Sequence, residues 1–216
     1  MDEIKYSTIN PDESFNFHCK RCGECCRKVK DSIMLEPYDF YRLALHLNQT
    51  PSEVMDRYTD AAFLDWGFPV LVLKTTGTDD ACIFLKDNSC SVQSAKPRTC
   101  RMYPLSAEPD VTSPGKFNYL VVSQKEQHFC GPEIKASKWM DDNFPPFERE
   151  MVKLDYLFIL EFGRIVRKID HKHEDEVNTL MLTFRYGLFD SALDFKEQFV
   201  RNMAALKFKL EELTRE

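Results

Sequence analysis

Glycine is scarce in this sequence, which has only seven glycines in 216 residues. No two of them lie within seven residues of each other. The dinucleotide-binding fingerprint and the phosphate-binding Walker loop both need clustered glycines, because the backbone must approach the phosphates closely. The scarcity of glycine therefore excludes a nucleotide-driven enzyme of the usual folds.

Long apolar runs and an excess of basic residues are also lacking. A membrane span requires about 20 consecutive apolar residues, and no segment of the sequence approaches that length. The segment from Met1 to Tyr6 lacks the apolar core of a signal peptide. With 29 basic and 35 acidic residues, the net charge is −6, which disfavours general binding to nucleic acid. We therefore expect a cytoplasmic protein that binds neither nucleic acid nor membranes.

The rest of the composition is typical of a folded protein. The sequence is 43% hydrophobic and 12% aromatic, which is too apolar for a disordered chain. Its length corresponds to one or two domains at about 150 residues per domain.

Cysteine, by contrast, is abundant and unevenly distributed. The eight cysteines fall within residues 19–130, and the last 86 residues contain none: Cys19, Cys22, Cys25, Cys26, Cys82, Cys90, Cys100 and Cys130. Such a group indicates either a disulfide framework or a metal site. Because cytosolic thiols are kept reduced, the expected compartment favours the metal site.

The spacing of the first four cysteines also favours metal binding. The two-residue gaps from Cys19 to Cys22 and from Cys22 to Cys25 let sulfurs converge on one ion or cluster. Neighbouring side chains usually point apart, so we expect that Cys25 and Cys26 do not both bind the same small ion. The predicted ligand pool is all eight cysteines, and its core is Cys19, Cys22, Cys25, Cys82, Cys90 and Cys100.

Basic residues surround both groups of cysteines. Lys20, Arg21, Arg27, Lys28 and Lys30 flank the first group, and Lys96, Arg98 and Arg101 flank Cys100. Cationic neighbours lower the pKa of a thiol, and the thiolate is the form that binds metal. We predict that Arg27, Arg98 and Arg101 bind the cofactor, where they would tune a metal centre; the alternative is that this basic cluster binds an anionic substrate.

Two histidines lie close to cysteines in the sequence. His18 precedes Cys19, and His128 is two residues before Cys130. Each could be a ligand or a proton carrier, and each could equally be an ordinary core or surface histidine.

The arrangement of these motifs resembles a known family. The residues that carry the resemblance are Phe17 to Arg27 (FHCKRCGECCR), Cys82 to Leu85, Cys90 to Val92, Lys96 to Leu105 (KPRTCRMYPL), and Cys130-Gly131-Pro132, where the family usually has Cys-Pro-Gly. Over about Phe17 to Ile134 the sequence is similar to the CxxCxxCC cysteine-cluster family of zinc- or iron-chelating domains. All eight cysteines match.

The resemblance implies a cysteine-ligated centre, either an iron–sulfur cluster of the 4Fe–4S type or zinc. One branch of the family, the flagellin lysine N-methylase, resembles an iron–sulfur enzyme that uses S-adenosylmethionine. This likeness implies a protein-modifying, lysine N-methyltransferase-like metalloenzyme with a protein substrate. That enzyme is larger, however, and the last 86 residues here contain no recognisable site for a methyl donor.

Two other functions are compatible with the same residues. Zinc could staple a non-catalytic module whose helical part binds a partner. A thiol redox sensor would need a spare reactive cysteine, for which Cys26 and Cys130 are the candidates.

The predicted fold class is α+β. We expect a small, irregular, β-containing metal domain packed with helices over residues 1–146, and a helical C-terminal region over 147–216 that packs on it. Within the first region we predict an irregular lead-in over 1–16, helices over 36–47 and 50–63, and strands over 32–35, 68–75, 81–85, 89–92 and 116–123. The strands over 81–85 and 89–92 should form a hairpin that turns at Asp87-Asn88. Apolar residues at helical spacing predict three amphipathic helices over 151–169, 177–188 and 195–213.

Overall fold

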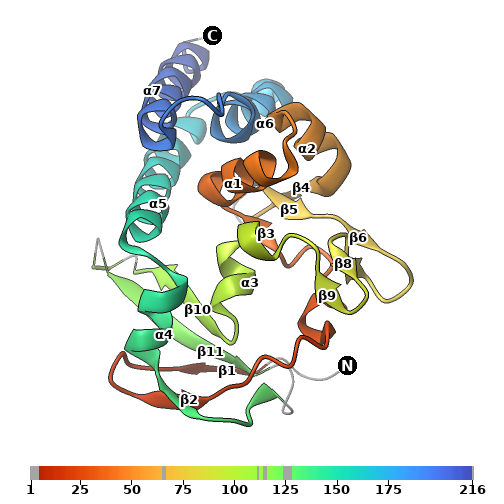
Figure 1. Ribbon diagram of the computed structural model, residues 1–216. Coiled ribbons are helices and arrows are strands. Elements are labelled where there is room, and N and C mark those ends of the chain that lie inside the picture. Colours follow the sequence, from red (N-terminus) through yellow and green to blue (C-terminus); the bar gives the residue numbers. More distant parts are fainter. Residues whose placement is uncertain (1–4, 65–66, 111, 114–115, 124–127, 216) are drawn as a thin grey trace.

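Helices and small antiparallel sheets make up the fold, which is seen here in a computed structural model (Figure 1). The structure describes residues 5–64, 67–110, 112–113, 116–123 and 128–215. The predicted α+β class is confirmed.

The α-helices lie in two groups along the chain, one within the cysteine-rich part and one after it. They are α1 (Pro37–Leu47), α2 (Pro51–Tyr58), α3 (Arg98–Met102), α4 (Ala136–Asn143), α5 (Pro146–Val166), α6 (Glu174–Leu182) and α7 (Phe195–Leu213). The three C-terminal amphipathic helices are therefore confirmed, with shifted ends. The helix α6 ends at Leu182 because the chain widens there into a π-helical turn, η5 (Thr183–Gly187).

The strands are short and pair in five small sheets. They are β1 (Lys5–Thr8), β2 (Ser14–Asn16), β3 (Met34–Leu35), β4 (Thr59–Phe63), β5 (Pro69–Leu73), β6 (Thr75–Thr76), β7 (Ala81–Cys82), β8 (Leu85–Lys86), β9 (Ser89–Cys90), β10 (Leu105–Pro109), β11 (Phe117–Ser123) and β12 (Glu133–Lys135). The sheet orders are β1-β11-β10, β12-β2, β3-β5-β4, β6-β7 and β8-β9.

The prediction of an irregular lead-in holds for residues 9–13, which contain a turn, and is wrong for residues 5–8 and 14–16; residues 1–4 lie outside the described residues. The strand β1 pairs with β11, with Lys5 opposite Ser123, and β2 pairs with β12, with Phe15 opposite Ile134. Both partners follow more than 100 residues later in the chain. These strands form because the distant partner strands provide hydrogen bonds to their backbone N–H and C=O groups. No local sequence pattern predicts such pairing.

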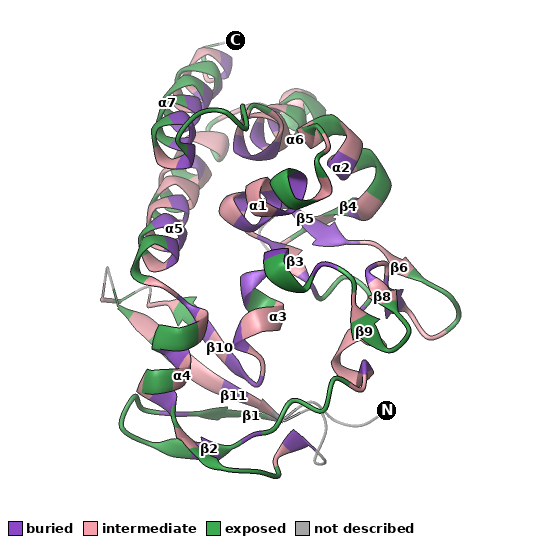
Figure 2. Ribbon diagram, in the orientation of Figure 1, coloured by how far each residue is buried: buried purple, intermediate pink, exposed green. Residues whose placement is uncertain are grey.

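The helix α2 begins as predicted and ends earlier than predicted. The Thr50 hydroxyl accepts a hydrogen bond from the Glu53 backbone, and the Glu53 carboxylate accepts one from the Thr50 backbone at 2.9 Å, which is a capping box. The helix stops at Tyr58, and residues 59–63 form β4 instead. The cause is the strand β5, whose five residues are all buried (Figure 2). Residues 59–63 pair with one edge of β5 in antiparallel register and so cover that edge.

The predicted hairpin turn at Asp87-Asn88 is confirmed. Asp87 and Asn88 both have positive φ values, 48° and 59°, as a two-residue type I′ turn requires. The hairpin itself, β8–β9, is shorter than predicted, because residues 81–82 pair with β6 instead.

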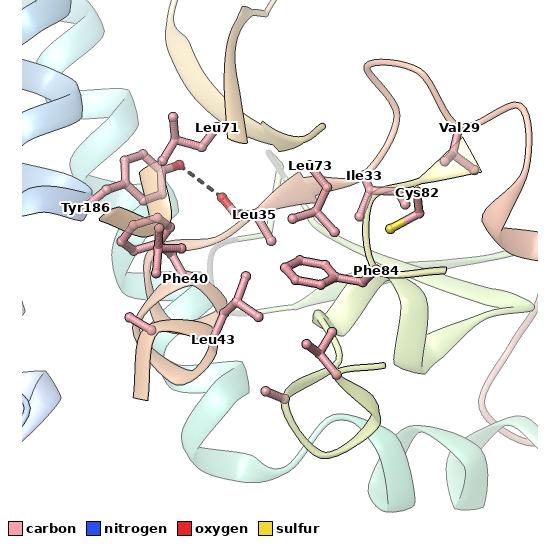
Figure 3. Close-up of a cluster of buried hydrophobic side chains, with 14 residues drawn as sticks. Val29, Ile33, Leu35, Phe40, Leu43, Leu71, Leu73, Cys82, Phe84 and Tyr186 are labelled. Atoms are coloured by element: carbon pink, nitrogen blue, oxygen red, sulfur yellow. Dashed lines mark hydrogen bonds between the residues drawn. The ribbon is translucent and has the colours of Figure 1, made fainter. Parts of the chain in front are cut away.

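Three hydrophobic clusters form the interior. The first joins β3, α1 and β5 to the cysteine-bearing turns, and there the Tyr186 hydroxyl donates a 3.0 Å hydrogen bond to the Leu35 carbonyl (Figure 3). The second joins α5, α6 and α7 to Phe68 and Val70, and the third lies between the β1-β11-β10 sheet and α4. No helix in the described part of the chain is both long and apolar enough to span a bilayer.

Candidate metal centre

Six of the eight predicted cysteine ligands line a single cavity of about 270 Å³. They come from the loop after β2, from the short turn η1 (Glu24–Cys26), from the end of β9 and from α3: Cys19, Cys22, Cys25, Cys26, Cys90 and Cys100. The fold thus gathers sulfurs that are far apart in the sequence, as the spacing predicted (Figure 1 shows η1 beside β9).

Gly23 allows the first cysteine loop to sit against the β8–β9 hairpin. Its φ is +74°, and a Cβ atom there would lie 3.0 Å from Leu85 Cδ1 and 3.1 Å from the Asn88 carbonyl oxygen. Only glycine permits both this backbone conformation and this close approach. The contact brings Cys25 and Cys26 to the same cavity as Cys90.

The side chains of Cys25 and Cys26 face the same cavity. Their sulfurs are 3.9 Å apart, so the prediction that they point apart is wrong. The reason is the tight turn η1, in which neighbouring residues follow neither an α-helix nor a strand. Two thiolates on one tetrahedral ion, each about 2.3 Å from it, would be about 3.8 Å apart. This pair can therefore share one ion.

The thiols differ in their readiness to ionise. The hydrogen bond from Cys26 lowers the pKa of the Cys25 thiol to about 6, with help from the positive charge of Lys96. The same hydrogen bond, together with burial, raises the pKa of Cys26. Burial raises the pKa values of Cys82 and Cys100. Of these four thiols, Cys25 is the one best prepared to meet a metal as the thiolate.

Two predicted ligands lie outside the wall of the cavity. Cys82 is buried within the first hydrophobic cluster, against which Cys26, Cys90 and Cys100 pack (Figure 3 shows Cys82). Cys130 is exposed, ahead of β12. A ligand role for either residue stays a prediction.

The three predicted cofactor-binding arginines are each held by an acidic residue. Arg101 lies on the cavity wall and donates to Glu148 Oε1 at 3.0 Å. Arg98 is buried off the wall, where it donates to Glu36 Oε1 at 2.9 Å, and Arg27 pairs with Asp79. The structure therefore gives Arg98 and Arg27 structural partners, and their role toward a cofactor stays a prediction.

The wall of the cavity carries positive charge. Its basic residues are Lys20, Arg21, Lys96 and Arg101, and no carboxylate lies among the described residues that line it. The charge of Lys96 helps to lower the pKa of Cys25, and at Cys82 and Cys100 it offsets part of the increase in pKa that burial causes. A cavity of this kind suits a negatively charged thiolate centre.

His128 and Tyr103 extend the wall beyond the cysteines. The His128 Nε2 atom is 3.2 Å from Cys22 Sγ, and its Nδ1 atom is 3.1 Å from the Tyr103 hydroxyl. Burial raises the pKa of Tyr103 to about 12, so the phenol stays neutral. Trp139 and Asn143 also line the cavity. They lie on α4, a helix that no local pattern in the sequence predicts.

Thiols and one imidazole are the donor set that zinc and iron–sulfur clusters use, whereas calcium and magnesium prefer oxygen ligands. The chemistry of the cavity therefore fits the group that the sequence implies. Among the described residues, no three side chains of His, Cys, Asp or Glu are gathered closely enough to hold one ion.

An α+β fold with a thiol-lined cavity defines a cysteine-cluster domain of the metal-chelating class. Residues 18–131 match the model of the CxxCxxCC family, which is described as "Putative zinc- or iron-chelating domain". The match spans more than half of the chain, and the chain belongs to this family. No curated protein and no solved structure matches the chain.

Proposed function

We propose that the protein holds an iron–sulfur cluster in the cysteine-lined cavity. The observation that carries the proposal is the convergence of six cysteines on one space of about 270 Å³. Four ligands about 2.3 Å from a single zinc ion need much less room, whereas a cluster held by thiolates occupies a larger volume. The cavity also offers more thiols than the four that one cluster requires.

The charge of the wall supports the same proposal. A cluster ligated by four thiolates is anionic, and charge and hydrogen bonds around its sulfurs set its reduction potential. Lys96 and Arg101 lie on the wall from the second group of cysteines, and Lys20 and Arg21 from the first. The Arg101 guanidinium stays charged, because Glu148 raises its already high pKa.

A cluster in this cavity would supply one-electron chemistry. The residues of the chain hold it and limit its contact with water. Phe17, Tyr103 and Trp139 form the apolar part of the wall, and their rings meet edge to face, with centroids 5.8 Å apart for Phe17 and Tyr103 and 5.3 Å for Phe17 and Trp139. Cys19, by contrast, is exposed, so the cavity remains open on that side.

Zinc in the same cavity is the second candidate. The 3.9 Å separation of the Cys25 and Cys26 sulfurs supports it, because it matches one edge of a tetrahedral ion. Methyl transfer with S-adenosylmethionine and a protein substrate, thiol redox sensing, and a cytoplasmic location stay predictions from the sequence, since no contact among the described residues bears on them.

The test is metal analysis of protein prepared without oxygen. We expect iron and acid-labile sulfide in similar amounts, with an absorption spectrum of an iron–sulfur protein. Cys90→Ser and Cys100→Ser should lose most of the iron, and Cys130→Ser, which replaces an exposed thiol off the cavity wall, should retain it. Stoichiometric zinc without iron would overturn the cluster in favour of the second candidate, and the absence of both metals would overturn metal binding here.

A further inference from the structure

His128 occupies a buried position on the wall of the cavity. Its side chain is only 4% exposed, and its ring meets those of Phe17 and Tyr103 edge to face. Its backbone carbonyl accepts a 3.1 Å hydrogen bond from the backbone of His18, which directly precedes the first cysteine of the loop. This hydrogen bond holds His128 next to the start of the cysteine loop.

The two nitrogens of the His128 ring have different partners. Nε2 is 3.2 Å from Cys22 Sγ, and Nδ1 is 3.1 Å from the Tyr103 hydroxyl. Histidines that bind metals usually use their second ring nitrogen in a hydrogen bond to an outer group, which fixes the ring orientation and the tautomer. Tyr103 is in the position to do this while Nε2 faces the sulfur.

The distance between Nε2 and the sulfur is close to that of two ligands on one metal. With zinc at about 2.3 Å from sulfur and about 2.05 Å from nitrogen, tetrahedral geometry places the two ligand atoms about 3.5 Å apart. The observed 3.2 Å separation thus needs a change of a few tenths of an ångström to admit a shared ion.

Resting on the proposed function, we propose that His128 is a metal ligand through Nε2, beside Cys22, and that Tyr103 positions its ring. The centre then has mixed sulfur and nitrogen coordination. In iron–sulfur proteins, replacement of thiolate by histidine raises the reduction potential. The cysteine spacing alone would predict an all-thiolate site.

X-ray absorption fine structure of the anaerobically prepared, metal-loaded protein tests this inference. We expect one nitrogen at about 2.0–2.1 Å besides the sulfur ligands in the wild-type protein. The same nitrogen should remain in the control His18→Ala, which removes an exposed imidazole next to Cys19. It should disappear in His128→Ala and in His128→Cys, and the cysteine variant should retain the metal with sulfur ligands only.

The Tyr103→Phe variant tests the positioning role. It removes the hydroxyl and keeps the ring, so we expect the metal to stay bound and the nitrogen signal to broaden or weaken. A nitrogen signal that persists in His128→Ala, or a metal-loaded wild-type protein with sulfur ligands alone, would overturn the inference while leaving the proposed function in place. A wild-type protein that retains neither iron nor zinc would overturn the proposed function and the inference with it.

Discussion

Asp39 is an ionisable residue held almost entirely away from water. It lies in α1 with 2% of its surface exposed, and it accepts a 2.8 Å hydrogen bond from the Arg98 backbone at the start of α3. Burial, and to a lesser degree the charge of Glu36, raise the pKa of its carboxyl to about 7. The residue therefore fixes the helix that carries Cys100, and its ionisation opposes folding.

The pH dependence of stability follows from this raised pKa. The unfolded chain loses the Asp39 proton near pH 4 and the folded chain near pH 7. The free energy of unfolding is therefore unaffected by this group below pH 4, and it decreases as the pH rises from 4 to 7. We expect Asp39→Asn to be more stable than wild type by roughly 2–4 kcal/mol at pH 8, with the difference vanishing near pH 4. Urea denaturation of both metal-free proteins at the two pH values measures this.

Groups that do not interact with Asp39 titrate alike in the two proteins, so their contributions cancel in the difference. An Asp39→Asn variant that is less stable than wild type at pH 8 and equal to it at pH 4 would show that the surrounding arginines outweigh burial. The cause assigned to the raised pKa would then be wrong.

Gly23 gives a second prediction at this scale. Gly23→Ala should destabilise the protein by about 1–3 kcal/mol more than Gly67→Ala. Both glycines have positive φ values, so both substitutions carry the left-handed backbone penalty, but a Cβ at Gly67 meets no atom of the described residues within 4 Å. Chemical denaturation measures the difference. Equal losses of stability in the two variants would mean that the β8–β9 hairpin moves to accommodate the added methyl group, and that the close contact at Gly23 does not limit stability.

The candidate site could be predicted from the sequence only in part. The sequence predicts the first group of cysteines because two-residue gaps are a local pattern, and it indicates the Lys96 segment because basic residues flank Cys100. The Cys22–His128 pair spans 106 residues, and the charge pair of Arg98 with Glu36 spans 62. Such contacts depend on the packing of whole elements, which spacing does not encode.

At the scale of elements, local sequence signals predict where a helix begins better than where it ends. The capping box at Thr50 determines where α2 begins. The end of α2 depends on β5, because residues 59–63 pair with β5 as a strand and do not continue the helix. The strands β1 and β2 were missed for the same reason. Tertiary pairing overrides local preference in short segments.

An ion pair in the interior joins the helical region to the β3-β5-β4 sheet. Arg185 in η5 donates to both carboxylate oxygens of Asp155 in α5, at 3.1 and 2.7 Å, and to the Pro69 carbonyl of β5 at 3.2 Å. Both side chains are buried, with exposed fractions of 2% for Arg185 and 9% for Asp155. The guanidinium also lies over the ring of Phe68, 4.9 Å from its centroid.

Removal of the carboxylate should leave Arg185 charged and unpaired in the interior. We expect Asp155→Ala to lower the free energy of unfolding by about 3–5 kcal/mol. The matched control is Glu161→Ala, also on α5, where the partner Lys207 and the glutamate are 41% and 40% exposed; there we expect less than about 1 kcal/mol. Denaturant titration compares the two variants. Similar losses would contradict a special role for the interior pair.

At the scale of the whole molecule, the three hydrophobic clusters share elements. The helix α5 places Met151 in the second cluster and Val152 in the third, and Tyr186 of the helical region completes the first. Phe68, from the cysteine-rich part of the sequence, belongs to the second cluster. The boundary at residues 146–147 stays a prediction, but these contacts show that the two regions do not have separate interiors.

Interlocked clusters should unfold together even though the chain exceeds the usual size of two-state domains. We expect far-ultraviolet circular dichroism, which reports helices, and near-ultraviolet dichroism, which reports aromatic packing, to give one coincident thermal transition.

Metal binding should raise the temperature of this transition. A free metal concentration about 1,000 times the dissociation constant should add about 4 kcal/mol to the free energy of unfolding. At 2–4 °C per kcal/mol, the melting temperature should rise by roughly 10 °C. Chelation should lower both transitions by the same amount, because the cavity wall includes α3 and packs on the first cluster. Helices that outlast the aromatic signal after chelation would instead mean that the cysteine-rich part melts alone.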